Sequence, residues 1–303
     1  MAAVLTLDNV KKTISGKEII KGLSFTVNEG EVFGFLGPNG AGKTTTIRMI
    51  VGLMRLSEGD IFVNGKSIKK DFEGAVKQIG AIVENPEMYK FLTGYQNLLQ
   101  YARMHKGISK KKINDVVKLV GLEARIHDKV KTYSLGMRQR LGLAQCLLHD
   151  PKLLILDEPT NGLDPAGIKE IRDHLRMLAR EKGMSVIVSS HLLSEMELMC
   201  DRIAIIQSGE LIDIQQVNDF VQQENTDYEF ETGPLKCASS WLVDNWKAKI
   251  TNRGFVVQAK RDDIPAILRE LVNKDVDVYS VEALSKSLED RFLEITNRLG
   301  DEK

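Results

Sequence analysis

The sequence predicts an α/β fold with a parallel-sheet core, on three observations. Short, largely apolar runs at residues 153–156 and 185–188 are typical of strands buried on both faces of a sheet. Helical patterns separate such runs, which is the alternation of βαβ units. A third run, at residues 31–36, leads into a glycine-rich stretch that a helical pattern follows at residues 43–53.

The glycine-rich stretch reads GPNGAGKT and fits the phosphate-loop pattern G-x-x-x-x-G-K-[ST]. Its backbone N–H groups and the following helix terminus favour an anion. Lys43 adds a cation for the β- and γ-phosphates of a nucleotide, and Thr44 adds a hydroxyl for Mg²⁺. Because a strand precedes the loop and a helix follows it, a chance glycine-rich turn is the weaker interpretation. The candidate binding residues are Gly37, Pro38, Asn39, Gly40, Ala41, Gly42, Lys43, Thr44 and Thr45.

An acidic pair, Asp157 and Glu158, follows the apolar run at residues 153–156. Ligand sites in open α/β sheets lie at the carboxyl ends of strands, where this pair is predicted. Asp157 is thereby positioned to meet the same Mg²⁺ as Thr44. Glu158 is positioned to polarise an attacking water. The alternative is an exposed acidic turn after a core strand.

Three further motifs complete a resemblance to the ATP-binding cassette (ABC) family. Residues 133–141 (YSLGMRQRL) are similar to its LSGGQ-x-x-R signature, residues 161–164 (NGLD) resemble its D-loop, and His191 resembles its switch histidine. All motifs occur in family order within residues 1 to about 218. The resemblance implies a P-loop NTPase fold with a parallel-sheet core, an antiparallel β part and a helical lobe at about residues 85–150. It also implies Mg²⁺-dependent ATP hydrolysis with Glu158, His191 and Lys43 as catalytic residues.

The resemblance further implies that two copies close head to tail around two ATP molecules. Ser134 and Gly136 would contact the γ-phosphate held by the partner copy, Asp164 would couple the two sites, and His191 would sense the γ-phosphate. Ser134 and Gly136 begin a helix and form a second anion-binding terminus. One chain has no further use for such a site if its own phosphate loop already holds the nucleotide, which favours use in trans. Simpler roles stay open: Ser134 and Asp164 as helix caps, and His191 as a structural residue.

Two positions depart from the family pattern. Glu84, in IVENP, stands where the family usually has Gln, and it joins Thr44 and Asp157 as a candidate metal ligand. This variant, the YSLG signature and residues 287–293 (SLEDRFL) resemble the cassettes of bacterial bacitracin-resistance and lantibiotic-immunity exporters. Ile14 stands where an adenine-stacking aromatic is expected. Since base–aromatic stacking is worth roughly 1–3 kcal/mol, we predict weaker discrimination between ATP and GTP.

Composition restricts the class of protein. The chain has 303 residues with 43% hydrophobic and 28% charged side chains, which are ordinary globular values. Its formal net charge is zero, so no overall field favours nucleic acid, and we expect no nucleic-acid partner. No apolar run reaches the ~18–20 residues of a membrane span, and Asp8 interrupts any secretory signal. Cys146, Cys200 and Cys237 have no metal-site spacing and are predicted to be reduced packing residues.

A polar stretch at residues 215–226 predicts a domain boundary. We predict an ABC nucleotide-binding domain at residues 1–218 and a small C-terminal α+β accessory domain at residues 219–303. Trp241 and Trp246 of the second domain are interpreted as core residues. Its strand-like runs are residues 228–232, 255–259 and 276–281, and its helical stretches are residues 239–245, 264–272 and 288–299.

The predicted helical lobe is rich in aromatic residues near Glu84. These aromatics either fill the core of the lobe or dock an intracellular helix of a membrane subunit, and sequence does not separate the two. They are Tyr89, Phe91, Tyr95 and Tyr101.

The resemblance implies an ATP-hydrolysing subunit that powers a separately encoded membrane permease and exports a peptide antibiotic. Such a subunit would be cytoplasmic and peripheral on the inner face of the plasma membrane. The alternative is a sensory or regulatory cassette that dimerises on ATP without driving transport. A chromosome-organising ATPase is disfavoured, because only about 90 residues without sustained heptads separate the phosphate loop from the signature.

Overall fold

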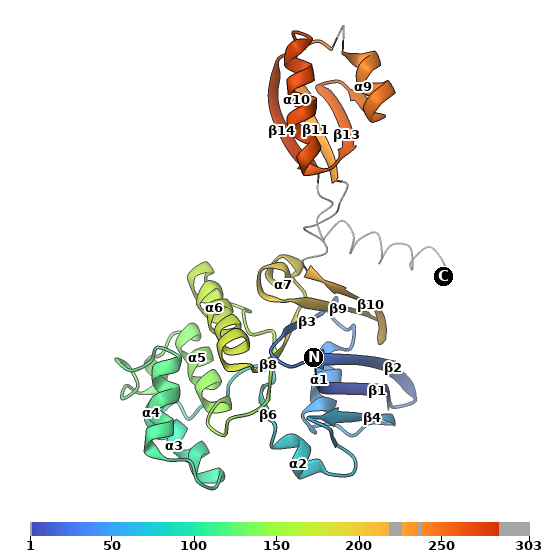
Figure 1. The fold of residues 1–303 in the computed structure, drawn as a ribbon. Coiled ribbons are helices and arrows are strands. Elements are labelled where there is room, and N and C mark those ends of the chain that lie inside the picture. Colours follow the sequence, from blue (N-terminus) through green and yellow to red (C-terminus); the bar gives the residue numbers. More distant parts are fainter. Residues whose placement is uncertain (1, 218–225, 236–237, 285–303) are drawn as a thin grey trace. The chain divides into compact units, whose positions relative to one another are not determined.

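The chain forms two compact units, Met1–Val217 and Asn218–Lys303 (Figure 1). The computed structural model describes residues 2–217, 226–235 and 238–284. The first unit combines a parallel and an antiparallel sheet, and the second unit is built on one antiparallel sheet.

A six-stranded sheet in the order β10-β9-β3-β8-β7-β6 forms the centre of the first unit. Its strands from β9 to β6 are parallel, and β10 pairs antiparallel with β9. Every residue of β3, β7 and β8 is buried, which confirms the prediction from the apolar runs. The bounds are β3 Val32–Leu36, β6 Ile79–Ile82, β7 Leu153–Asp157, β8 Ser185–Ser190, β9 Arg202–Gln207 and β10 Glu210–Gln216.

The antiparallel sheet of this unit has the order β2-β1-β4-β5. Its strands are β1 Ala3–Ile14, β2 Lys17–Asn28, β4 Glu58–Val63 and β5 Lys66–Ser67. Asn64 and Gly65 have φ values of 47° and 77° and form the tight turn between β4 and β5. Two successive residues in the left-handed region suit the twist of a two-residue hairpin.

The main core joins the two sheets around the first helix, α1 (Lys43–Ile50). The ring of Phe25 on β2 stacks on Phe33 of β3, with centroids 5.4 Å apart. Leu5 and Ile47 are fully buried in the same cluster. This packing fixes the end of β3 and the start of α1, and therefore the loop between them.

Helices α3, α4 and α5 of the first unit are inserted between β6 and β7, whereas α2 precedes β6, α6 follows β7 and α7 follows β8. Figure 1 shows α3, α4 and α5 gathered on the side of the unit away from β1, β2 and β4. Helix α1 ends earlier than residue 53, because Gly52 adopts a left-handed φ of 77°. The bounds are α2 Phe72–Val76, α3 Gly94–Met104, α4 Lys110–Leu119, η1 Val130–Thr132, α5 Leu135–Cys146, α6 Pro165–Lys182 and α7 Leu193–Met199.

The second unit has a four-stranded antiparallel sheet in the order β12-β13-β11-β14. Phe230 and Phe255 stack at its core with centroids 4.6 Å apart, and Trp241 and Trp246 pack half-buried against that core. The predicted helix at residues 288–299, residues 287–293 and Cys237 lie outside the described residues. The bounds are β11 Thr226–Thr232, α9 Ser239–Trp246, β12 Lys249–Thr251, β13 Gly254–Ala259, η2 Arg261–Asp263, α10 Ile264–Asn273 and β14 Val278–Leu284.

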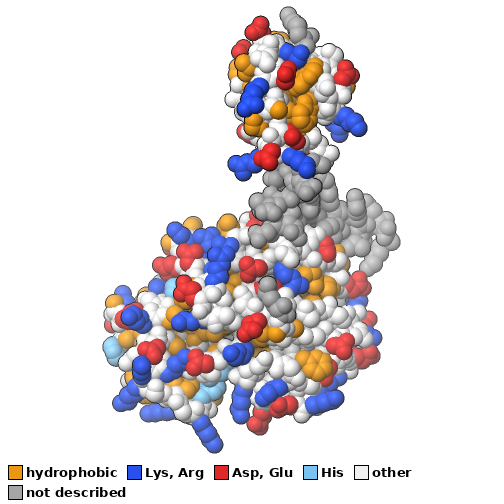
Figure 2. Space-filling view, viewed as in Figure 1, with side chains coloured by type: hydrophobic (Ala, Val, Ile, Leu, Met, Phe, Trp, Pro, Cys, Tyr) orange, Lys and Arg blue, Asp and Glu red, His pale blue; other side chains and the backbone are white. Residues whose placement is uncertain are grey.

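The described helices include none that is both long and apolar enough to cross a bilayer. On the face drawn in Figure 2, basic and acidic side chains alternate over the first unit, in keeping with a net charge of zero.

Candidate nucleotide-binding and hydrolysis site

The glycine-rich loop connects β3 to α1 and turns around the side chain of Lys43. Lys43 Nζ donates to the carbonyl oxygens of Gly37 (2.6 Å) and Pro38 (3.4 Å). The lysine side chain is only 6% exposed. The ammonium group therefore lies inside the loop, where two of its three N–H donors bond loop carbonyls.

Two glycines of this loop are required by close packing. Gly42 has φ 109°, and a Cβ there would lie 2.5 Å from Ile20 Cδ1. A Cβ at Gly37 would lie 2.3 Å from the carbonyl oxygen of Ile206. Any side chain at these positions would displace backbone or core atoms, so the loop shape depends on glycine.

The acidic pair follows β7, beside the end of β8. Parallel pairing places Asp157 opposite Ser189. Ser189 Oγ donates to Asp157 Oδ1 (2.6 Å) and accepts from the backbone N–H of Glu158 (3.0 Å). Glu158 itself has φ 51°, an uncommon conformation for a residue other than glycine. One serine therefore holds Asp157 and the backbone of Glu158 in this turn.

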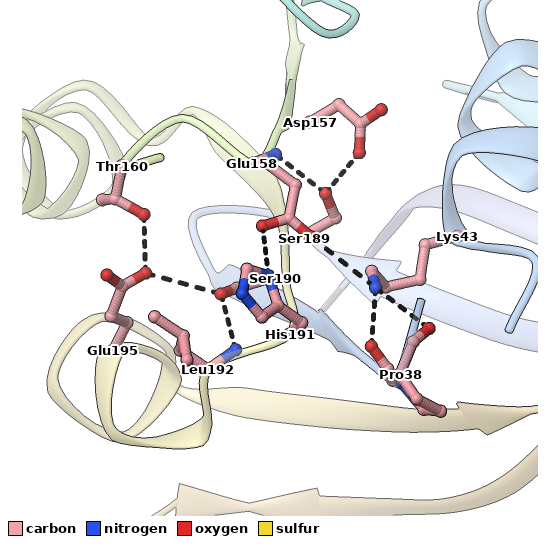
Figure 3. Close-up of polar contacts among 11 residues, drawn as sticks. Pro38, Lys43, Asp157, Glu158, Thr160, Ser189, Ser190, His191, Leu192 and Glu195 are labelled. Atoms are coloured by element: carbon pink, nitrogen blue, oxygen red, sulfur yellow. Dashed lines mark hydrogen bonds and ion pairs between the residues drawn. The ribbon is translucent and has the colours of Figure 1, made fainter. Parts of the chain in front are cut away.

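The carboxylate of Glu158 lies between a cation and an imidazole (Figure 3). Its Oε1 is 3.6 Å from Lys43 Nζ, and its Oε2 is 2.8 Å from His191 Nδ1. Because a carboxylate only accepts hydrogen bonds, Nδ1–H of His191 is the donor. The other ring nitrogen of His191, Nε2, makes no hydrogen bond to Glu158.

These groups line one cavity of about 460 Å³. A nucleotide phosphate chain therefore has room beside Lys43 and Glu158. The cavity contains seven of the nine predicted loop residues; Gly37 and Ala41 of that set do not line it. Its lining residues are Ile19, Pro38, Asn39, Gly40, Gly42, Lys43, Thr44, Thr45, Glu158, Asn161 and His191.

The donor set suits a phosphate-bound Mg²⁺. Asp157 is nearly fully buried, and its Oδ2 makes no hydrogen bond with another described residue. The described residues contain no cluster of three or more metal-binding side chains. A Mg²⁺ ion bound with a nucleotide uses only one or two carboxylates, and phosphates and waters complete its shell. Asp157 and the Thr44 hydroxyl are the groups that would hold it.

Ser134, Gly136 and Asp164 do not line this cavity. Ser134 is the N-cap of α5, and its Oγ accepts from the N–H of Met137 (3.2 Å). Asp164 is the N-cap of α6, and its Oδ1 accepts from the N–H of Gly167 (3.0 Å). The simpler capping interpretation is therefore confirmed for both residues. Their roles in a dimer stay predictions.

Glu84 also lies outside the cavity lining. Its carboxylate is 60% exposed and forms an ion pair with Arg48 of α1. Its backbone has φ 68°. The expected role of Glu84 in binding Mg²⁺ stays a prediction, and it requires Glu84 to exchange Arg48 for the metal.

Ile14 ends β1 and is half-exposed, and it does not line the cavity. The nearby apolar residue that does line it is Ile19 on β2. The consequence of Ile14 for base preference stays a prediction.

The aromatic residues of the helical lobe divide into two pairs. Tyr89 and Phe91 are 53% and 69% exposed, and their ring centroids are 5.8 Å apart. Tyr95 is half-buried against His127, and the hydroxyl of half-buried Tyr101 donates to the carbonyl of Glu87. Tyr95 and Tyr101 therefore pack within the lobe, whereas Tyr89 and Phe91 face solvent, and docking of a membrane subunit on these two rings stays a prediction.

Sequence reasoning missed several polar contacts in and near this site. Ser189 was predictable in principle, since it is a polar residue at the end of an otherwise apolar strand. Arg48 follows Thr44 by four residues on α1 and therefore shares its helix face. No sequence signal paired Thr160 with Glu195, which are hydrogen-bonded across 35 positions.

A phosphate loop, an acidic strand end and a histidine around one cavity define a nucleotide-binding ATPase of the P-loop class. A family profile described as "ABC transporter" matches residues 20–161. The chain is 62% identical to the uncharacterized ABC transporter ATP-binding protein YhcH of Bacillus subtilis (strain 168), over 100% of this chain and 99% of the relative. The chain therefore belongs to the ABC transporter ATP-binding protein family.

Two further comparisons extend this assignment. The chain is 37% identical to the bacitracin transport ATP-binding protein BcrA of Bacillus licheniformis, over 97% of this chain and 98% of the relative. The solved structure of cbiO1 from Clostridium perfringens, part of the ABC transporter complex cbiONQ, superposes with a TM-score of 0.67. That match has 27% identity and covers 72% of this chain and 90% of cbiO1. The predicted fold and the ATPase class are confirmed.

Proposed function

We propose that this chain is the ATP-hydrolysing subunit that powers a separate membrane permease and exports a peptide antibiotic such as bacitracin or a lantibiotic. The observation that carries the proposal is the position of Glu158, between Lys43 and His191 in one cavity. The export of a peptide is supported by the similarity to a bacitracin transport protein over nearly the whole chain.

The charged and polar residues of the site have distinct tasks in the proposed hydrolysis. Lys43 and the loop N–H groups bind and orient the β- and γ-phosphates of ATP. Glu158 accepts the proton of the attacking water, and His191 holds Glu158 and hydrogen-bonds the γ-phosphate. Mg²⁺, held by Asp157 and Thr44, would neutralise phosphate charge. Glu84 is proposed as a further ligand when it leaves Arg48.

Two copies of the chain form the active unit in this proposal. Ser134 and Gly136 lie at the start of α5 and outside the cavity of their own chain, which supports their use on the nucleotide of a second copy. Asp164 follows Asn161 of the cavity by three residues and connects the cavity to that interface. Head-to-tail closure would complete both sites together.

The permease is the proposed membrane partner, and the chain would act at the inner face of the plasma membrane. Membership of the permease complex is supported by the solved relative that is part of a transporter complex. The exposed pair Tyr89 and Phe91 is the proposed contact with the permease. The division between Val217 and Asn218 supports an accessory second domain from about residue 219.

The test is co-purification of tagged Glu158→Gln from detergent-solubilised membranes with ATP and Mg²⁺. Mass spectrometry would identify the partners. We expect a polytopic membrane protein in stoichiometric amount. We also expect increased sensitivity to peptide antibiotics when this chain and that membrane protein are both deleted. A chain that dimerises on ATP and recovers no membrane protein would overturn the export proposal in favour of a sensory cassette.

A further inference from the structure

One carboxylate oxygen connects the two loops that carry the hydrolysis residues. Thr160 Oγ1 donates to Glu195 Oε2 at 2.6 Å, and Ser190 Oγ donates to the same oxygen at 3.4 Å. Figure 3 shows these two hydroxyls pointing at Glu195 from different segments. Thr160 belongs to the loop after β7, and Ser190 ends β8.

Both hydroxyls are adjacent to residues of the site. Thr160 follows Glu158 by two positions, and its carbonyl accepts from the N–H of Leu163 (3.1 Å), next to Asp164. Ser190 precedes His191, and its Oγ also accepts from the N–H of Leu192 (2.9 Å). His191 therefore lies between Ser190 and Leu192, which the Ser190 hydroxyl connects by its hydrogen bond to the Leu192 N–H.

The contacts are largely shielded from water. Thr160 and Ser190 are nearly fully buried, while Glu195 is half-buried in the first turn of α7. A buried hydroxyl that loses its acceptor is costly, and the 2.6 Å contact of Thr160 is closer than the 3.4 Å contact of Ser190, so this oxygen holds the Glu158 loop more tightly than the His191 loop. Glu195 itself does not line the cavity and touches no reacting atom.

We propose that Glu195 is a positioning residue for ATP hydrolysis, which holds the Glu158 loop and the His191 loop in register through Thr160 and Ser190. This inference rests on the proposed roles of Glu158 and His191. The distance of 2.8 Å between those two side chains depends on both loops. Loss of Glu195 lets the loops separate, which misplaces Glu158 while the phosphate loop still binds ATP.

The test compares Glu195→Ala, Glu195→Gln and Thr160→Val in the full-length chain. A displacement of about 1 Å in a catalytic geometry is able to lower the rate about 100-fold, so we expect kcat of Glu195→Ala to fall between about 10- and 100-fold. The ATP dissociation constant should stay within about threefold, because Lys43 and its loop are unchanged. Thr160→Val removes one hydroxyl at nearly constant volume and should lower kcat in the same way.

Glu195→Gln retains a side-chain oxygen that accepts from both hydroxyls, so it should keep kcat within about threefold of wild type. The double variant with Glu195→Ala and Thr160→Val should be no slower than the slower single variant, because both changes break the same Thr160–Glu195 hydrogen bond. Glu197→Ala is the matched control in the same helix. The Glu197 carboxylate makes no hydrogen bond or ion pair with another described residue.

Several outcomes would overturn the inference. These are an unchanged kcat in Thr160→Val, an equal loss in Glu197→Ala, or a parallel loss of ATP binding and kcat. If Glu195→Ala unfolds, Thr160→Val and Glu195→Gln still decide the result. Failure of the proposed hydrolytic roles is distinguishable, because the wild-type chain would then hydrolyse no ATP, whereas failure of the export proposal alone would leave the hydrolysis rates of these variants measurable.

Discussion

His191 Nδ1 lies 2.8 Å from Glu158 Oε2, across a separation of 33 residues in the chain. This contact joins the loop after β7 to the loop after β8, which are neighbours because the two strands pair in parallel. It orients Glu158 toward the cavity that also contains Lys43. The geometry suits a carboxylate that accepts a proton from water, with a histidine that fixes its direction.

Replacing Glu158 with Gln should separate ATP binding from hydrolysis. The amide keeps the shape of the side chain but no longer accepts a proton efficiently. Because general bases contribute about 10²–10⁴-fold, we expect kcat to fall by at least about 100-fold with ATP affinity retained. Phosphate release and equilibrium ATP binding are the measurements. A Glu158→Gln chain that hydrolyses ATP near the wild-type rate would remove Glu158 as the general base.

The Arg48–Glu84 ion pair should modulate the requirement for Mg²⁺. If Glu84 leaves Arg48 to bind the metal, Arg48→Gln frees the carboxylate and lowers the Mg²⁺ concentration for half-maximal hydrolysis. The pair is exposed, so stability should change by less than about 1 kcal/mol. The Mg²⁺ concentration for half-maximal hydrolysis is measured in Arg48→Gln, Glu84→Gln and the double variant. The difference between the shift in the double variant and the sum of the single shifts gives the coupling between Arg48 and Glu84. A shift in Arg48→Gln that persists when Glu84→Gln is added would exclude Glu84 as its cause.

Truncation of the exposed aromatic pair should affect membrane binding without affecting the fold. Tyr89→Ala and Phe91→Ala remove rings that are mostly in solvent, so the melting temperature should stay within a few degrees. We expect the fraction of the chain that sediments with permease-containing membranes to fall. Phe72→Ala, at an exposed aromatic of α2, is the matched control. Unchanged sedimentation of stable Tyr89→Ala and Phe91→Ala chains would contradict the docking role.

An aromatic side chain at position 14 should increase discrimination between nucleotides. Ile14→Tyr supplies a stacking face for adenine, and a gain of roughly 1–3 kcal/mol corresponds to about 5- to 150-fold in affinity. Competition binding of ATP and GTP to wild type, Ile14→Tyr and the control Ile14→Leu measures this effect. A wild-type preference for ATP already above about 100-fold would show that the loss of the aromatic is without consequence.

Two buried thiols should make the fold sensitive to alkaline pH. Burial raises the pKa of Cys146 from 9.0 to about 12 and raises the pKa of Cys200 in the same direction. Above pH 9 the unfolded thiols lose protons that the folded thiols keep, so the free energy of unfolding decreases as pH rises toward 12. The expected slope is about 1.4 kcal/mol per pH unit for each thiol.

Urea unfolding of the wild type, Cys146→Ala and Cys200→Ala between pH 8 and 11 measures that slope. Each single variant should show a smaller decrease with pH than the wild type. An equal decrease in all three chains would assign the alkaline sensitivity to other groups, such as tyrosine and lysine side chains.

Much of the site was predictable because its motifs are local. The phosphate loop, Asp157 and Glu158 each depend on a strand that ends within one or two residues of them. The burial of β3, β7 and β8 followed from their apolar composition. The capping roles of Ser134 and Asp164 likewise depend on N–H groups three residues away.

Partners that are distant in the chain were not predictable. Arg48 binds Glu84 across 36 positions, and Thr160 binds Glu195 across 35. The division of the lobe aromatics into an exposed and a half-buried pair also required the packing of the lobe. In each case a short sequence window contains only one member of the contact.

The sequence by itself determined the parallel-sheet fold, the phosphate loop and the family, because turn geometry and strand burial are encoded in neighbouring residues. Only the tertiary structure decided that Glu158 meets His191, that Ser189 holds Asp157, and that Glu84 pairs with Arg48. The physical reason is strand register: side chains far apart in the chain meet only once the strands and helices that carry them have paired and packed.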